Sequence, residues 1–142
     1  MSTDLIEMWH QRARPNPSHK DFNVQLGCHV EEFTEMLEAL ALENYHLVPL
    51  MDKLIELSEG LKKGTIETAY IDPVPLLDSL ADQVVTAVGV GHCANMKVTE
   101  AVYRVNRSNW SKFDNDGQPI RDANGKITKG PNYAPPELGD LV

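Results

Sequence analysis

The chain has 142 residues, of which 42% are hydrophobic and 24% charged, and this fits one globular domain that can bury a small core. Its formal net charge of -8 argues against a general nucleic-acid or membrane-surface binder, because phosphate backbones and anionic lipids repel an acidic surface. The two cysteines, Cys28 and Cys93, form no CxxC pair, so we expect a reduced, cytoplasmic protein. We also expect no signal peptide and no membrane span.

Apolar residues at three- and four-residue spacing predict five helices in chain order. Their approximate ranges are 4–12, 22–44, 47–62, 75–93 and 97–112. Prolines in the segments 14–18 and 71–75 separate the first and fourth helices from their neighbours, because proline lacks a backbone donor and restricts the residue before it. The fourth helix is the most apolar, and we predict it to be the most buried.

The last part of the chain departs from the helical pattern. Asn115-Asp116-Gly117 and Asn124-Gly125 are strong turn signals, so we predict a short β-hairpin followed by an extended tail at residues 130–136. The expected fold is an all-α bundle of four to five helices in a single domain. It comprises an N-terminal helix and linker (1–21), a helical core (22–112), and a C-terminal hairpin and tail (113–142).

The second predicted helix carries a cluster of acids, Glu31, Glu32 and Glu35, in a stretch without basic residues. No Lys or Arg occurs between Lys20 and Lys53. Because a helix advances about 100° per residue, Glu35 lies on nearly the same side as Glu31 and Glu32, and the carboxylates can converge on one cation. The competing interpretation is a solvated helix face, which is the usual place of glutamates on a helix.

The fourth predicted helix carries a second acidic pair, Asp78 and Asp82, inside another window without Lys or Arg that runs from Gly64 to Met96. Like charges four residues apart repel unless a cation lies between them. If the second and fourth helices pack antiparallel, two acids from each meet in a carboxylate box. Oxygen ligands without histidine or thiolate favour Mg²⁺, or alternatively Mn²⁺.

More than half of the basic residues fall in the last third of the chain, and they predict an edge that binds phosphate. Asn109 and Lys112 share a helix face by their spacing, and Arg107 and Lys129 are further candidates. Simple charge balancing on an acidic protein is the alternative. A ferritin-like di-iron site is set aside, because it needs Glu-x-x-His on two helices and this chain has only His29-x-x-Glu32.

Three motifs together resemble the MazG-like all-α nucleotide pyrophosphohydrolases, which include phosphoribosyl-ATP pyrophosphohydrolase. They are Glu31-Glu32-Phe33-Thr34-Glu35, Asp78-Ser79-Leu80-Ala81-Asp82 and Asn109-Trp110-Ser111-Lys112. The ending at residues 125–133 looks like the tail of a phage-type branch of that family. The resemblance covers roughly residues 22–136 and implies a MazG-like helical bundle.

The resemblance also implies residue roles. Glu32, Glu35 and Asp82 match magnesium ligands, Glu31 matches a base or a further ligand, and Asn109 and Lys112 match positions near the substrate phosphates. Ser79 departs from the pattern, because the family has Glu there; Asp78 offers a carboxylate one residue earlier.

Our leading hypothesis is a Mg²⁺-dependent hydrolase that splits a nucleoside triphosphate into the monophosphate and pyrophosphate. The alternative is a catalytically weak or inactive helical module that binds nucleotide or metal and regulates, which Ser79 makes conceivable. A third option is a purely structural helical dimer. The second and fourth helices carry apolar residues on more than one side, and this predicts a homodimer or homotetramer.

Overall fold

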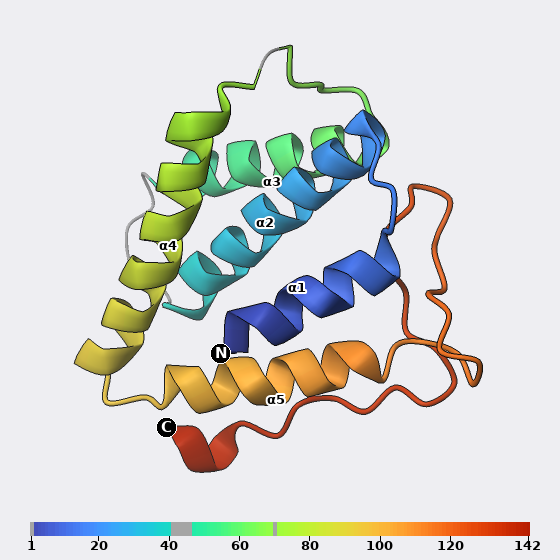
Figure 1. Cartoon of the computed structure of the whole chain (residues 1–142). Helices are drawn as coiled ribbons and strands as arrows, with labels where there is room; N and C mark the ends of the chain where they lie inside the picture. The colour runs from blue at the N-terminus through green and yellow to red at the C-terminus, as the bar shows by residue number, and fades with distance from the viewer. Residues whose placement is uncertain (1, 41–46, 70) are drawn as a thin grey trace. The chain divides into compact units, whose positions relative to one another are not determined.

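The computed structural model describes residues 2–40, 47–69 and 71–142, and Figure 1 shows its helices. The described residues form α1 (Ser2–Ala13), α2 (His19–Ala39), α3 (Val48–Lys63), α4 (Pro73–Cys93), α5 (Val98–Trp110) and the short 3-10 helix η2 (Gly139–Leu141). These elements confirm the prediction of an all-α chain with five helices. The predicted end of the second helix, at residues 41–44, lies outside the described residues.

Local sequence signals explain where the helices begin and end. Ser18 caps α2: its hydroxyl accepts from the Asp21 backbone amide, and the Asp21 carboxylate accepts from the Ser18 backbone amide. Asp72 caps α4 in a similar way, by accepting from the Val74 amide. α3 ends at Gly64, whose φ of 75° lies in the left-handed region that glycine adopts without strain.

The described residues group into two compact units. One unit contains α1, α4, α5 and the C-terminal segment with η2, and we call it the α5 unit. The other contains the α2–α3 pair and the turn Arg121–Lys126, and we call it the α2 unit.

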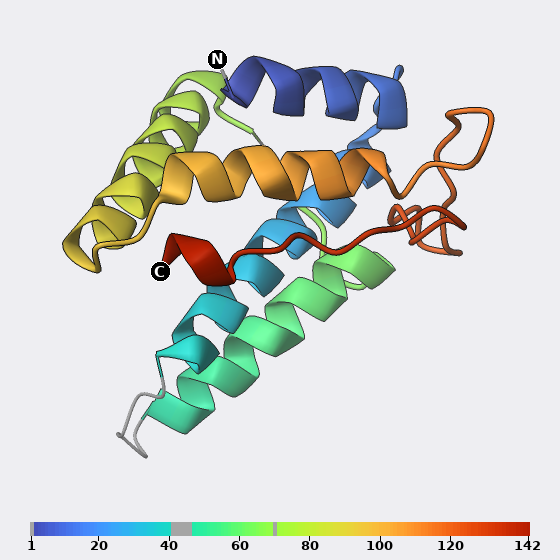
Figure 2. The ribbon, with the colours of Figure 1, turned by 90° about the horizontal axis from the view of Figure 1, so that it is seen from below.

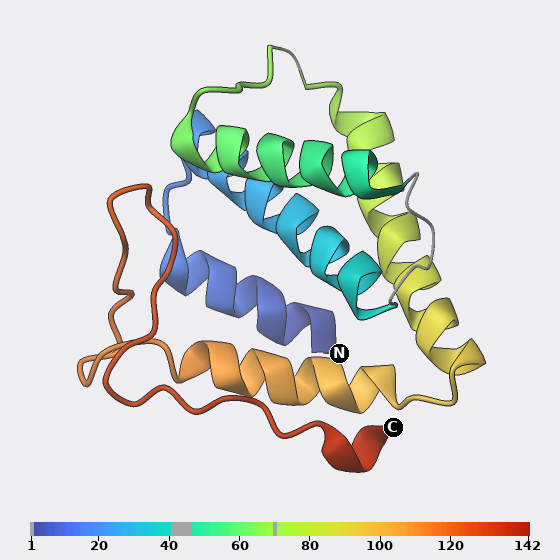
Figure 3. The same ribbon diagram turned by 180° about the vertical axis from the view of Figure 1, so that it is seen from behind.

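In the α2 unit, α2 and α3 lie side by side along their length, as Figures 1 and 3 show. Gly27 permits this close approach, because a Cβ atom there would lie 2.7 Å from the Ser58 carbonyl oxygen. The Ser58 hydroxyl donates to the Gly27 carbonyl at 2.9 Å, and both residues are buried. Nearer the start of α2, the Asn23 side chain accepts from the Thr68 hydroxyl at 3.0 Å. The two helices are therefore joined by polar contacts as well as by packing.

In the α5 unit, α1 packs along α5 around a small aromatic core (Figure 3). Trp9 and Phe113 stack with their ring centroids 5.7 Å apart, and Ala13 and Ile127 are buried with them. The Arg12 guanidinium donates to the Gly117 carbonyl at 3.0 Å and so fixes the loop that follows α5. Figure 2 shows the C-terminal segment running beside α5. This segment and α5 form the two walls of a cavity.

α4 contradicts the prediction that it is the most buried helix. Gly91 is its only residue classed as buried, whereas Val74, Leu77 and Val85 are 75%, 70% and 68% exposed. The reason is that α4 packs only lightly on α5 near Gly91, while its apolar residues surround the helix rather than forming one stripe. By length and composition alone, α4 is long and apolar enough to cross a membrane. One such helix is weak evidence for a span.

The predicted C-terminal β-hairpin is also wrong, because the described residues form no β-strand there. Two similar turns take its place. The Asp114 carboxylate accepts from the amides of Asp116 and Gln118, and the Asp122 carboxylate accepts from the amides of Asn124 and Lys126. Gly117 and Gly125 have the positive φ that their turn signals predicted. Around the second turn the pairing stops after a single bridge, in which the Asp122 amide donates to the Lys126 carbonyl and the Thr128 amide donates to the Ile120 carbonyl. Pro119, next along the chain, lacks an amide donor.

Candidate functional site

The acids of α2 fall on two sides of the helix in the α2 unit. Glu31, Glu35 and Glu38 follow one another at four- and three-residue spacing, and all three line a small cavity between α2 and α3. Glu32 is exposed and is not among the residues that line this cavity. The structure thus brings together Glu31 and Glu35 of the predicted set and adds Glu38.

The cavity has a volume of about 170 Å³, and α3 supplies its second wall. The lining residues of α3 are Ile55, Ser58, Glu59 and Lys62, which repeat at helical spacing. Its inner hydroxyls are already bonded within the protein: Ser58 donates to Gly27, and Thr34 donates to the Val30 carbonyl at 2.8 Å. The remaining polar groups of the cavity are mainly carboxylates.

Glu31 has two lysine partners that are distant in the sequence. One oxygen accepts from the Lys62 ammonium at 2.8 Å, and the other accepts from the Lys126 ammonium at 2.9 Å. Lys62 belongs to α3, and Lys126 belongs to the second of the C-terminal turns. Arg121, at the other end of that turn, lies 3.5 Å from the Asp21 carboxylate. Two ion pairs therefore hold the turn against α2.

These ion pairs set the protonation of Glu31. Partial burial by itself raises the pKa of this carboxyl, but hydrogen bonds and charges from Lys62 and Lys126 outweigh it and lower the pKa below the ordinary value. The same contact with Glu31 raises the pKa of Lys126. Glu31 is therefore an ionised partner of two cations at neutral pH, and the lowered pKa makes it a weaker base than a free glutamate.

Glu32 and Glu35 differ from Glu31 in their contacts with other side chains. Neither has a hydrogen bond or an ion pair to a side chain among the residues that the structure describes. Glu59, across the cavity, is paired with Lys63. Among the described residues, Glu31 therefore forms ion pairs through both of its oxygens, and Glu32 and Glu35 form none.

The second predicted pair, Asp78 and Asp82, lies on α4 in the α5 unit, and both side chains are exposed. Their i, i+4 spacing places them on one side of the helix. Within the described parts of the chain, neither carboxylate has a basic partner. Ser79 lies between them in sequence and points about 100° away from Asp78 around the helix axis.

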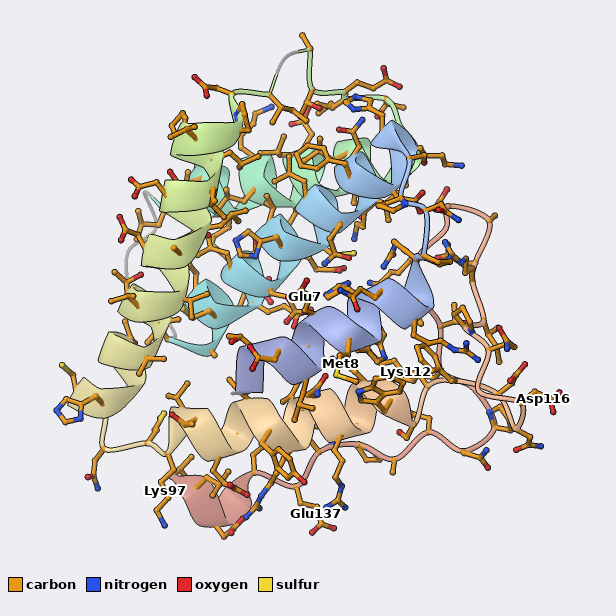
Figure 4. All side chains as sticks on the ribbon, in the orientation of Figure 1. Glu7, Met8, Lys97, Lys112, Asp116 and Glu137 are labelled. Atoms are coloured by element: carbon orange, nitrogen blue, oxygen red, sulfur yellow. The ribbon has the colours of Figure 1, made fainter. Side chains whose placement is uncertain are left out.

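The predicted phosphate ligands do not converge. Arg107 lines a large cavity between α5 and the C-terminal segment, whereas Asn109, two residues later, lies about 200° further around the helix. Figure 4 shows Lys112 near the C-terminal end of α5, away from Lys97 at its start. The Lys129 ammonium lies over the Tyr133 ring, 4.6 Å from its centroid. Of the predicted set, only Arg107 lines this cavity.

The donor groups agree in kind with magnesium, since every predicted ligand is a carboxylate. The proposed box takes two acids from each unit, Glu32 and Glu35 from α2 and Asp78 and Asp82 from α4. Among the described residues, no three His, Cys, Asp or Glu side chains form a group that holds a metal ion. Each unit by itself thus supplies half of the ligand set, and the complete box stays a prediction.

Sequence reasoning missed the lysines of the Glu31 site and the acids that share its cavity. Lys62 shares a helical stripe with Ile55, Ser58 and Glu59, and this stripe is visible in the sequence. Lys126 had no comparable signal, because 95 residues separate it from Glu31.

Comparison of the chain with protein-family models, with curated proteins and with solved structures found no match. The likeness to MazG-like pyrophosphohydrolases therefore rests on the motif residues alone.

Proposed function

We propose that this chain is a MazG-like, Mg²⁺-dependent pyrophosphohydrolase that cleaves a nucleoside triphosphate to the monophosphate and pyrophosphate. The observation that carries the proposal is the selective pairing of the acids. Glu31 forms ion pairs with Lys62 and Lys126, whereas Glu32, Glu35, Asp78 and Asp82 form no ion pair in the described parts of the chain. A divalent cation, Mg²⁺ or Mn²⁺, supplies the charge that these four acids lack.

Under this proposal Glu32, Glu35, Asp78 and Asp82 hold the cation. When bound there, the ion would supply positive charge to the phosphate chain and help to activate the attacking water. The acid that accepts the proton of the attacking water is Glu31 by resemblance. Both Glu31 oxygens accept from lysines, and these contacts lower the pKa of the carboxyl and make it a weaker base.

A substitution experiment tests the hydrolase. Asp82→Asn and Glu35→Gln each remove one ligand charge, and we expect pyrophosphate release to fall by about 100-fold or more. Asp52→Asn and Glu67→Gln are matched controls, since both side chains are exposed and lie outside the proposed box. Release is measured with Mg²⁺ on a panel of canonical and modified nucleotides. Full activity in Asp82→Asn and Glu35→Gln contradicts the proposal.

The second candidate is a regulatory module that binds nucleotide or metal without turnover. Two observations favour it: Ser79 stands at the family's usual Glu position, and the lysines engage both oxygens of Glu31. Calorimetry separates the two functions. Nucleotide binding in the presence of Mg²⁺ without product after long incubation identifies the module, and measurable turnover excludes it.

We further propose that the protein works in the cytoplasm as a homodimer or homotetramer. The support is the exposed apolar surface of α4, which includes Leu77, Val84 and Val85. Neither Cys28 nor Cys93 forms a disulfide within the described residues, in agreement with a reducing compartment. Light scattering tests the assembly, and a stable monomer at micromolar concentration contradicts it.

A further inference from the structure

A cavity in the α5 unit lies between α5 and the C-terminal segment, and none of the proposed metal ligands lines it. Its volume is about 620 Å³, within the range of pockets that hold small molecules. α5 contributes residues at helical spacing from Glu100 to Ser111, and the opposite wall is the segment Ala134–Glu137. Figure 2 shows this segment beside α5.

The walls of this cavity are fixed by hydrogen bonds within the protein. The Ser108 hydroxyl donates to the Ala134 carbonyl at 2.6 Å, and the Ala134 amide donates to the Ser111 hydroxyl at 2.9 Å. The Arg104 guanidinium donates to the Glu137 carbonyl at 2.9 Å and to both carboxylate oxygens of Asp140. Two prolines, Pro135 and Pro136, stiffen the segment further. The cavity is therefore formed before any ligand arrives.

Three lining side chains remain available to a ligand. Arg104 is occupied by Asp140, Glu137 and Glu100. By contrast, the side chains of Arg107, Tyr103 and Glu137 have no partner among the described residues. The cavity thus presents one free guanidinium, one phenol ring that is 43% exposed, and one free carboxylate.

We infer that this cavity binds a nucleoside monophosphate whose base carries an exocyclic amino group. The Arg107 guanidinium matches a phosphate through two parallel hydrogen bonds. The Tyr103 ring stacks on the base, and the Glu137 carboxylate accepts from the amino group. A phosphate ion alone leaves most of the 620 Å³ empty, whereas a nucleotide uses all three groups. The cavity contains no proposed metal ligand, and Arg107 is the one residue that it shares with the predicted phosphate-binding edge.

Cytidine and uridine monophosphates test the inference, because they have nearly the same size and differ mainly in the amino group. Calorimetry is performed on the full chain in EDTA, so that no divalent cation takes part. We expect CMP to bind about 10-fold more tightly than UMP, cytidine or inorganic phosphate, since each of these lacks one charge-assisted contact or the base. Failure to bind in EDTA leaves the hydrolase proposal unaffected.

Substitutions assign the contacts. Arg107→Ala is expected to weaken CMP binding about 10-fold, to the level of cytidine, and Glu137→Gln to remove the preference for CMP over UMP. Tyr103→Ala weakens both nucleotides, whereas Tyr103→Phe keeps the ring and preserves binding. Lys20→Ala is the control, because it removes a positive charge outside the cavity. Thermal melting confirms that each variant is folded.

Two results overturn the inference. One is the absence of CMP binding by the unmodified chain at millimolar concentration. The other is CMP binding that survives Arg107→Ala and Tyr103→Ala unchanged.

Discussion

α2 and α4 are both helices that carry acidic and apolar residues, but they differ in how far other parts of the chain cover them. On α2, Glu31 lies between two lysines, and Gly27 lets α3 pack closely enough for Ser58 to bond to the α2 backbone. On α4, the acids Asp78 and Asp82 and most of the apolar side chains are exposed. Contacts with neighbouring elements, rather than the hydrophobicity of the helix itself, therefore decide how far a helix is buried in a single chain. α4 is the more apolar helix, yet within its unit it packs on α5 near Gly91 and leaves most of its apolar side chains exposed.

The largest expected effect concerns the open face of α4. Val85→Glu places a charge on a side chain that is 68% exposed in the single chain. If a second copy covers this face, the substitution buries an unpaired charge and weakens association by about 3 kcal/mol or more. Light scattering at micromolar concentration should then show the monomer mass. Gln83→Glu is the control, because a polar side chain already stands there. An unchanged oligomer with Val85→Glu excludes α4 from the interface.

A matched pair of glycine substitutions tests the difference in packing between the two helices. In Gly27→Ala the new methyl group meets the Ser58 carbonyl, and we expect a net loss of about 1–3 kcal/mol in the free energy of unfolding. In Gly89→Ala nothing lies within 4 Å, and the higher helix propensity of alanine should stabilise α4 by up to about 1 kcal/mol. Urea unfolding measures both. Effects of the same sign contradict the close α2–α3 contact.

The Glu31 ion pairs predict a dependence of stability on pH. The folded-state pKa of Glu31 lies below its ordinary value of 4.5, so its contribution to stability is present above that pH and is lost as the pH falls through the folded-state pKa. Glu31→Gln should therefore cost about 1–2 kcal/mol at pH 7 and progressively less in acid. Glu38→Gln, which removes an acid without described partners, should show no such trend. An equal cost of Glu31→Gln at pH 7 and pH 3 is incompatible with these ion pairs.

The smallest expected effect comes from restoring the family's acid on α4. Ser79→Glu adds a carboxylate three residues before Asp82, and we expect the proposed site to bind Mg²⁺ up to about 10-fold more tightly. Calorimetric titration with Mg²⁺ measures the change. Ala87→Glu adds the same charge on the side of α4 away from Asp78 and Asp82 and serves as the control. Equal effects of the two substitutions indicate general electrostatics rather than a ligand at position 79.

Local signals in the sequence predicted the helices well. Apolar periodicity placed the starts of α2 and α4 at residues 22 and 75, within three residues of His19 and Pro73, and Gly117 and Gly125 mark turns. These signals succeed because each acts within about four residues. The hairpin prediction failed because turn signals do not show how far the flanking residues pair. Around the second turn the pairing ends with the Thr128–Ile120 hydrogen bond, next to Pro119, and no strand forms there.

The candidate site was only partly predictable, for a physical reason that Glu31 illustrates. The sequence shows an acid cluster without a basic residue nearby, and it predicts a cation. The structure supplies two cations at Glu31 from residues 31 and 95 positions away. Glu38 and Glu59 likewise became neighbours only when α2 and α3 packed together.

The sequence by itself determined the all-α character of the chain, the approximate range of each helix and the identity of its acidic residues, because helix periodicity and caps are short-range properties. The tertiary structure alone decided which acids keep their charge uncompensated and which helix remains exposed. Both depend on contacts between residues far apart in the chain. Glu31 is paired because α3 and the turn Arg121–Lys126 reach it, and α4 is open because only its end near Gly91 packs on α5.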